Sequence, residues 1–179
     1  MAKPRVTTKQ QALLTHLDGM THMLWLDPEQ LVTTTVGRQR TEQIERAIEY
    51  LIRSSVLMWH VRIDSTLTMV PEAHAQSGNK VSLRAKHITY ALAERSSLLT
   101  KLEVIKSILE VPTEIQKSLR ALNEVRNVCA HRLIIDNDEG RLVYKKHDLL
   151  KLACFHEFVM DMGDILNQYE PETRWLLDI

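Results

Sequence analysis

The chain has 179 residues, of which 44% are hydrophobic and 26% are charged, and its formal net charge is zero. This composition is typical of one globular domain with a hydrophobic core, and the neutral charge argues against a protein that coats long nucleic-acid duplexes. Because no apolar run is long enough for a membrane span and residues 1–11 lack a signal-peptide core, we expect a cytoplasmic single domain over residues 1–179.

The N-terminal half is predicted to be helical. Only five glycines and five prolines occur, which favours an all-α fold. Apolar residues at helical intervals predict a first helix over residues 7–26 and a long helix over residues 41–67. The long helix offers i, i+4 charge pairs such as Glu49 with Arg53, which are typical of a solvated face. Residues 31–36 have no clear period and are predicted as a short helix or a loop.

The middle of the chain contains several helix-breaking signals. Proline, glycine and asparagine within residues 69–81 predict a loop. A helix is predicted over residues 82–93, and Ser96 with Ser97 either begins a separate helix or bends the same one. The apolar stripe then continues until Pro112, which stops it.

The residue pattern no longer indicates a helix after residue 132. Residues 133–146 are predicted as a small β-hairpin or an extended loop, with Gly140 supplying a positive φ. A last long helix is predicted from His147 or Asp148 to about Gln168, and Pro171 is expected to end it. The tail over residues 169–179 is apolar, so it either docks on the bundle or meets a partner.

The helix predicted over residues 113–131 combines a buried stripe with polar residues. The stripe consists of Leu119, Leu122, Val125 and Cys129. Arg126, Asn127 and His131 lie among these apolar neighbours, where a cation and an imidazole are costly unless they are paired or used.

Arg126 and His131 do not share a helical face. They are five residues apart, which places them about 140° apart around a straight helix. Two copies of this helix, related by a dimer axis, can bring an arginine and a histidine from different chains together. Alternatively, the helix frays near His131 and lets that side chain swing.

The segment Arg126-Asn-Val-Cys-Ala-His131 resembles the signature of HEPN domains, in which an arginine and a polar residue precede a histidine by a few positions. The resemblance implies a bundle of four to six helices with a short hairpin after the motif helix. It also implies a homodimeric, metal-independent endoribonuclease that needs no cofactor. Its setting in that family is a toxin with an antitoxin or regulatory partner, or an antiphage defence system.

The residue types suit RNA cleavage by attack of the 2′-OH on the adjacent phosphorus. His131 is predicted to be the general acid or base, and Arg126 the phosphate clamp, because a guanidinium binds phosphate oxygens as a fork. Asn127 is predicted to orient these groups. Further cations near the motif either contact RNA or are solvated surface charges: Arg132, Arg141, Lys145 and Lys146.

The same residues also fit a purely structural role. Arg126 can pair with an acid such as Glu45 or Glu124, and His131 can cap carbonyls at the end of its helix. Under that reading the chain is a non-catalytic HEPN-like module that dimerises and binds a partner protein or a nucleotide as a regulator.

The sequence gives no sign of a metal site. His60, His87, His147 and His156 lack ligand-like spacing, and a His-Glu-x-x-His pattern is absent. Cys129 and Cys154 lie in apolar helical contexts and are predicted to be buried free thiols.

Overall fold

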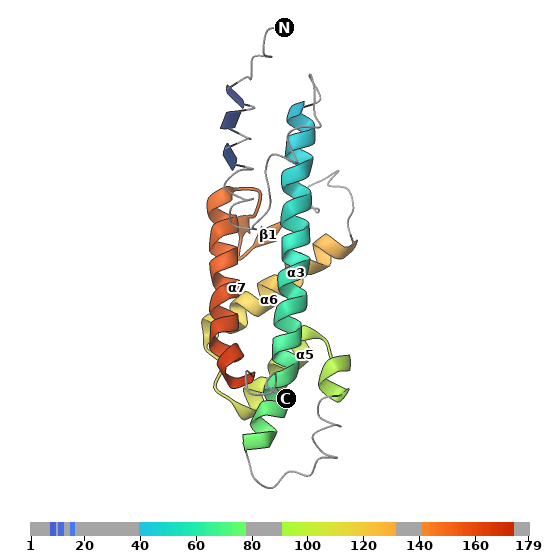
Figure 1. The fold of residues 1–179 in the computed structure, drawn as a ribbon, viewed down its shortest axis with the longest axis vertical. Coiled ribbons are helices and arrows are strands. Elements are labelled where there is room, and N and C mark those ends of the chain that lie inside the picture. The colour runs from blue at the N-terminus through green and yellow to red at the C-terminus, as the bar shows by residue number, and fades with distance from the viewer. Residues whose placement is uncertain are drawn as a thin grey trace.

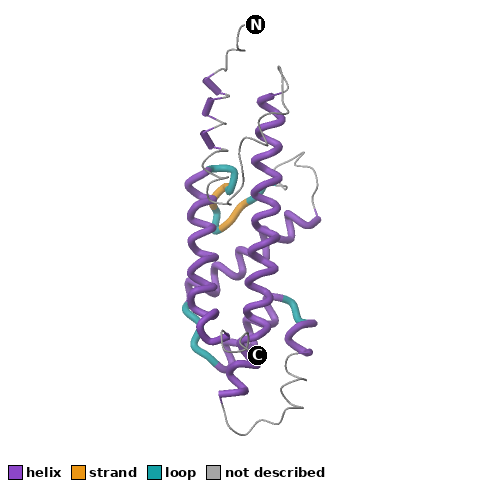
Figure 2. The backbone as a smooth tube through the Cα atoms, viewed as in Figure 1, coloured by secondary structure: helices purple, strands orange, loops and turns teal. Residues whose placement is uncertain are grey.

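The structure, a computed structural model, describes residues 8–9, 11–12, 15–16, 40–77, 91–131 and 141–173. Most of this part is helical, and a small antiparallel hairpin interrupts it (Figures 1 and 2). The elements are α3 (Arg40–Ser77), α5 (Leu98–Ile108), α6 (Thr113–His131), β1 (Val143–Tyr144), β2 (His147–Asp148) and α7 (Leu152–Thr173). The predicted all-α fold with a short β-hairpin is therefore confirmed. None of the described helices combines the length and apolar character that a membrane crossing requires.

Helix α3 is the central element of the bundle. Its 38 residues make a rod about 57 Å long, and α5, α6 and α7 all pack against it. Helix α7 lies alongside α3, and α6 runs obliquely across the pair in the view of Figure 1. The core consists of fully buried apolar side chains from α3, α5, α6, β1 and α7, including Ile52, Val56, Ile63, Leu102, Ile105, Leu119, Leu122, Tyr144, Phe155, Phe158 and Met162.

Helix α6 has the predicted bounds and the predicted buried stripe. It runs over Thr113–His131, and its four stripe residues Leu119, Leu122, Val125 and Cys129 are all buried. This prediction is confirmed because the apolar spacing of the segment matches the helical period.

Helix α3 extends further than its sequence suggested. The loop predicted to begin at residue 69 is wrong as far as Ser77, because Pro71 lies inside the helix. A proline there removes one backbone hydrogen bond. The apolar stripe nevertheless continues through Val70 and Ala73, which are buried, and their burial outweighs that loss.

Ser97 begins a separate helix, which decides between the two alternatives left open by the sequence. Its hydroxyl oxygen accepts a hydrogen bond from the backbone N–H of Thr100 at 3.2 Å, so it caps the N-terminus of α5. Of the helix predicted over residues 82–93, only residues 91–93 are described, and they are helical.

The hairpin is shorter and later than predicted. Val143 pairs with Asp148 and Tyr144 pairs with His147, so the turn is formed by Lys145 and Lys146. Both lysines have positive φ, 46° and 72°, as a type I′ turn requires. This type of turn normally carries Asn-Gly, so a turn formed by two lysines could not be predicted from the sequence. Residues 132–140, including the predicted turn at Gly140, lie outside the described residues.

The last helix is displaced towards the C-terminus relative to its prediction. His147 and Asp148 belong to β2, so α7 begins at Leu152. It continues through Pro171 to Thr173, so the prediction that Pro171 ends helical order is wrong. The described part of the predicted first helix, residues 8–9, 11–12 and 15–16, is helical. Residues 31–36 and 174–179 lie outside the described part.

Candidate functional site

The backbone of α6 fixes the geometry of the motif. The helix remains regular through His131, so Arg126 and His131 are about 140° apart around it and about 7.5 Å apart along its axis. The side chain of His131 lies outside the described residues. Within one chain, the two motif positions therefore face different directions.

Arg126 is half-buried and has no acidic partner in the part of the chain that the structure describes. Its Nη1 donates a hydrogen bond to Oδ1 of Asn127 at 3.1 Å. Among the described residues no carboxylate lies within ion-pair distance of its guanidinium. Glu45, one of the partners considered from sequence, pairs instead with Lys9 at 3.1 Å. The guanidinium thus keeps its capacity to bind an anion.

His60 of α3 lies in the electrostatic neighbourhood of Arg126. Burial lowers the pKa of this half-buried histidine below 6.5, and the charge of Arg126 lowers it further. Asp64 acts in the opposite direction, and Lys101 lowers the pKa again. The imidazole is therefore neutral at neutral pH, and one of its nitrogens carries a proton that can be donated to a hydrogen bond.

An ion pair between a buried lysine and a partly exposed aspartate lies one turn along α3 from His60. Lys101 of α5 is only 2% exposed, and its Nζ is 2.6 Å from Oδ2 of Asp64 on α3. It also lies 3.4 Å from the Asp64 backbone carbonyl. Because Asp64 neutralises Lys101, Arg126 supplies the unbalanced positive charge in this group.

No sequence pattern indicated His60, Asp64 and Lys101 as members of one group. A signal was present for two of them, since His60 and Asp64 are four residues apart and share a face of α3. Lys101 is far along the chain and joins them only through packing of α5 on α3.

Arg53 connects α3 to the end of the motif helix. Its Nη1 donates to the backbone carbonyl of Val128 at 3.4 Å, and its Nε lies 2.7 Å from Glu49. The carbonyl of Val128 is among the last four of α6, which have no partner inside a helix ending at His131. The predicted pair of Glu49 with Arg53 is confirmed, but Arg53 is buried and not on a solvated face.

The predicted RNA contacts outside α6 lie around the hairpin. Arg141 and Lys146 are exposed, whereas Nζ of Lys145 lies 2.7 Å from Oδ2 of Asp161 on α7. Arg132 lies outside the described residues. Their contact with RNA stays a prediction, and the charge of Lys145 already has a partner.

Cys129 lies inside the motif but is not a reactive thiol. It is buried, and burial raises the pKa of its thiol to about 11, so the group stays protonated and packs as an apolar residue. Cys154 is half-buried and free. In the described residues no group of three or more His, Cys, Asp or Glu side chains is arranged to hold a metal ion.

No family model, no curated protein and no solved structure matches the chain. The functional argument therefore depends on the chemistry and placement of the residues described above.

Proposed function

We propose that the chain is a metal-independent endoribonuclease of the HEPN class that acts as a homodimer. The observation that supports this proposal best is Arg126, a half-buried guanidinium with no carboxylate partner among the described residues. An arginine kept only for stability normally has a carboxylate partner when it is partly buried. A guanidinium free of such a partner suits the non-bridging oxygens of a phosphodiester.

The proposed reaction needs no redox agent or metal. The 2′-OH of the RNA attacks the adjacent phosphorus, the bond from O2′ to phosphorus forms, and the bond from phosphorus to O5′ breaks. A base takes the 2′ proton and an acid protonates the leaving O5′, and we assign His131 to this proton transfer. Arg126 stabilises the charge on the phosphoryl oxygens, and Asn127 orients the guanidinium. The products carry a 2′,3′-cyclic phosphate and a 5′-OH.

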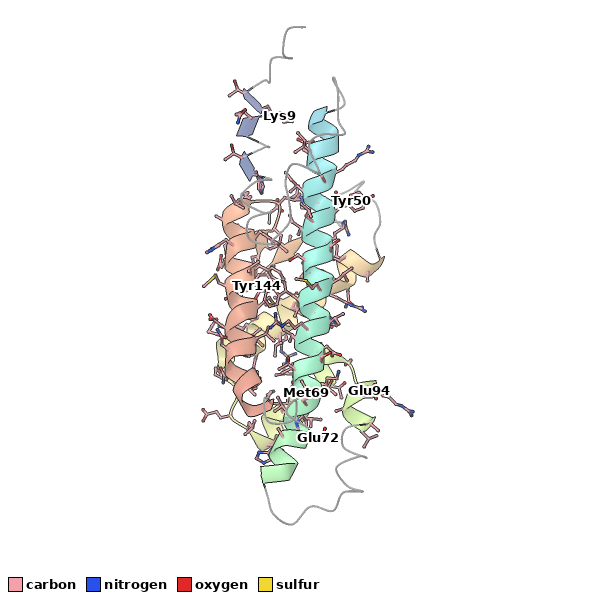
Figure 3. The ribbon with its side chains drawn as sticks, in the orientation of Figure 1. Lys9, Tyr50, Met69, Glu72, Glu94 and Tyr144 are labelled. Atoms are coloured by element: carbon pink, nitrogen blue, oxygen red, sulfur yellow. The ribbon has the colours of Figure 1, made fainter. Side chains whose placement is uncertain are left out.

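The helix geometry supports the proposal of a homodimer. Since Arg126 and His131 of one chain diverge, a second copy has to supply the missing half of the site. The exposed face of α3 supports such an association because it holds one charged residue in four turns. Its exposed residues are Tyr50, Ser54, Met58, Val61, Arg62 and Ser65. Tyr50, labelled in Figure 3, is 66% exposed on this face.

The second candidate function is a non-catalytic HEPN-like module that dimerises and binds a regulatory partner. The same face of α3 favours it, since a protein interface needs no catalysis. Under the nuclease proposal the biological setting is a toxin with an antitoxin, or an antiphage defence effector, and cleavage of RNA separates the two candidates.

The deciding experiment incubates the purified full chain with mixed cellular RNA in the presence of a chelator. We expect products with 2′,3′-cyclic phosphate ends, and we expect His131→Ala to lower the rate by about 10²–10⁴-fold. Arg120→Ala is the matched control, because Arg120 lies on the same helix and pairs with Glu103 at 2.9 Å. Cleavage that persists unchanged in His131→Ala would refute the assignment of the histidine, and a wild-type chain that never cleaves RNA would favour the binding module.

A further inference from the structure

We propose that a pocket between α3, α5 and the helical segment at residues 91–95 binds a small, uncharged apolar molecule that carries one aromatic ring. The inference goes beyond the proposed function and does not depend on it. None of the described residues that line the pocket belongs to the site at Arg126, Asn127 and His131. The pocket is therefore a second site of the chain.

The size of the pocket fits one ring. The described residues that line it are Pro71, Leu92, Ala93, Ser96, Lys101 and Val104. Leu92 and Val104 are 65% and 44% exposed, so they form its mouth, whereas Lys101 is 2% exposed and lies at its closed end. The volume of the pocket is about 180 Å³, and an apolar protein cavity of about 150 Å³ holds a benzene molecule. A single aromatic ring can therefore enter it.

The polar side chains of the pocket already have partners inside the protein. Oγ of Ser96 donates a hydrogen bond to the backbone carbonyl of Leu92 at 2.8 Å. Nζ of Lys101 donates to Oδ2 of Asp64 at 2.6 Å and to the Asp64 backbone carbonyl at 3.4 Å. Among the described residues, the lining therefore carries no unbalanced charge. An ionic ligand would lose its hydration without gaining a counter-charge there, so the pocket favours an uncharged occupant.

Helix α5 is fixed at several points, so the walls of the pocket are preformed. Its residues Leu98, Leu102 and Ile105 are buried in the core, and the cap at Ser97 fixes its first turn. A ligand would not have to order these walls on binding. It would also remove the exposed apolar surface at the mouth of the pocket from water. Both effects favour the binding of an apolar molecule.

The test follows the methyl signals of Leu92 and Val104 by NMR in the full chain while benzene is added. We expect saturable shifts of both sets of signals, and Leu92→Ala and Val104→Ala identify them by their loss. The methyl signals of Val61, which is exposed on α3 and is not among the described lining residues, should not move. Benzoate, the same ring with one negative charge, should bind at least about tenfold more weakly, because its carboxylate gains no partner.

Ala93→Phe is the variant that fills the pocket, and Ala91→Phe is its control. Both alanines belong to the same helical segment, but Ala91 is exposed and is not among the described lining residues. We expect benzene binding to weaken by about tenfold or more in Ala93→Phe and to stay unchanged in Ala91→Phe, with circular dichroism checking that both chains are folded. Val104→Glu is a second variant at an exposed position, and its charge at the mouth should also weaken benzene binding by about tenfold or more.

Three results would overturn the proposal. The first is a set of shifts that rise linearly with the benzene concentration and do not saturate. The second is benzoate binding as tightly as benzene, which would assign the pocket to a charged ligand. The third is an equal loss of affinity in the two alanine variants. If Ala93→Phe does not fold, unchanged benzene binding in Val104→Glu overturns the proposal in its place.

Discussion

Two polar clusters of this protein differ in how their charges are balanced. At the hairpin, Asp161 of α7 accepts hydrogen bonds from the Tyr144 hydroxyl at 2.8 Å and from Lys145 at 2.7 Å. Tyr144 also packs edge-on against Phe158, with ring centroids 5.1 Å apart, and lies between α7 and α3 (Figure 3). Every charge of this hairpin cluster has a partner within it.

The second cluster, formed by His60, Asp64, Lys101 and Arg126, contains one cation more than it has anions. Its lysine is 2% exposed, against 24% for the lysine of the hairpin cluster, and among the described residues its arginine is hydrogen-bonded to a neutral amide. The two clusters illustrate two different roles for partly buried charges. A balanced cluster fixes the fold, whereas an excess cation at a half-buried position is available to a ligand.

The largest expected effect is on stability, at Asp64. Asp64→Ala leaves Lys101, which is 2% exposed, without its counter-charge, so we expect a loss of about 3–5 kcal/mol in the free energy of unfolding. Asp161→Ala is the matched comparison, because Lys145 is 24% exposed and can turn to water; we expect a loss of about 1–3 kcal/mol there. Urea denaturation followed by circular dichroism measures both. A larger loss at Asp161 than at Asp64 would contradict this ranking of the two ion pairs.

The next expected effect separates stability from activity. Arg126→Ala should change the unfolding free energy by no more than about 0.5 kcal/mol, because no ion pair among the described residues is lost. The same change should lower RNA cleavage by about 10²-fold or more. Asp161→Ala should show the reverse pattern, with lower stability and an unchanged cleavage rate for the folded protein. If Arg126→Ala destabilises the chain as much as Asp161→Ala does, Arg126 has a structural role.

The smallest expected effect is the pH dependence contributed by His60. Burial and the charge of Arg126 lower the pKa of His60, so below pH 6.5 the unfolded chain binds more protons than the folded chain. Stability should therefore fall as the pH decreases through and below 6.5. His16 contributes in the same direction, since burial lowers its pKa as well.

His60→Gln should remove part of this slope and leave the stability above pH 6.5 nearly unchanged. Urea denaturation on both sides of pH 6.5 tests it, with His156→Gln, an exposed position on α7, as the control. An identical slope in wild type and His60→Gln would show that His60 does not titrate differently in the folded state.

Regular helices with a clear apolar period were predictable from the chain. The bounds of α6 and its buried stripe agree with the prediction because the burial of Leu119, Leu122, Val125 and Cys129 follows from their spacing alone. The angle between Arg126 and His131 is a consequence of the same periodicity, and it predicts that a second copy has to complete the site.

Elsewhere in the chain, tertiary contacts outweighed the local helix and turn propensities. The helix predicted over residues 41–67 continues through Pro71 to Ser77, because Val70 and Ala73 on either side of the proline are buried. Lys145 and Lys146 form a turn that glycine normally forms, and the ion pair of Lys145 with Asp161 helps to hold it there. Such positions depend on distant residues, so local propensity misjudges them.

The amino-acid sequence by itself determined the helical class, the motif helix and the direction in which each motif residue leaves it, because these depend on composition and on a period of 3.6 residues. Only the tertiary structure decided which charges meet. It placed Lys101 against Asp64, and it paired Lys145 with Asp161. Which charged side chains pair depends on distances across the packed bundle. For residues far apart along the chain, the local sequence does not predict those distances.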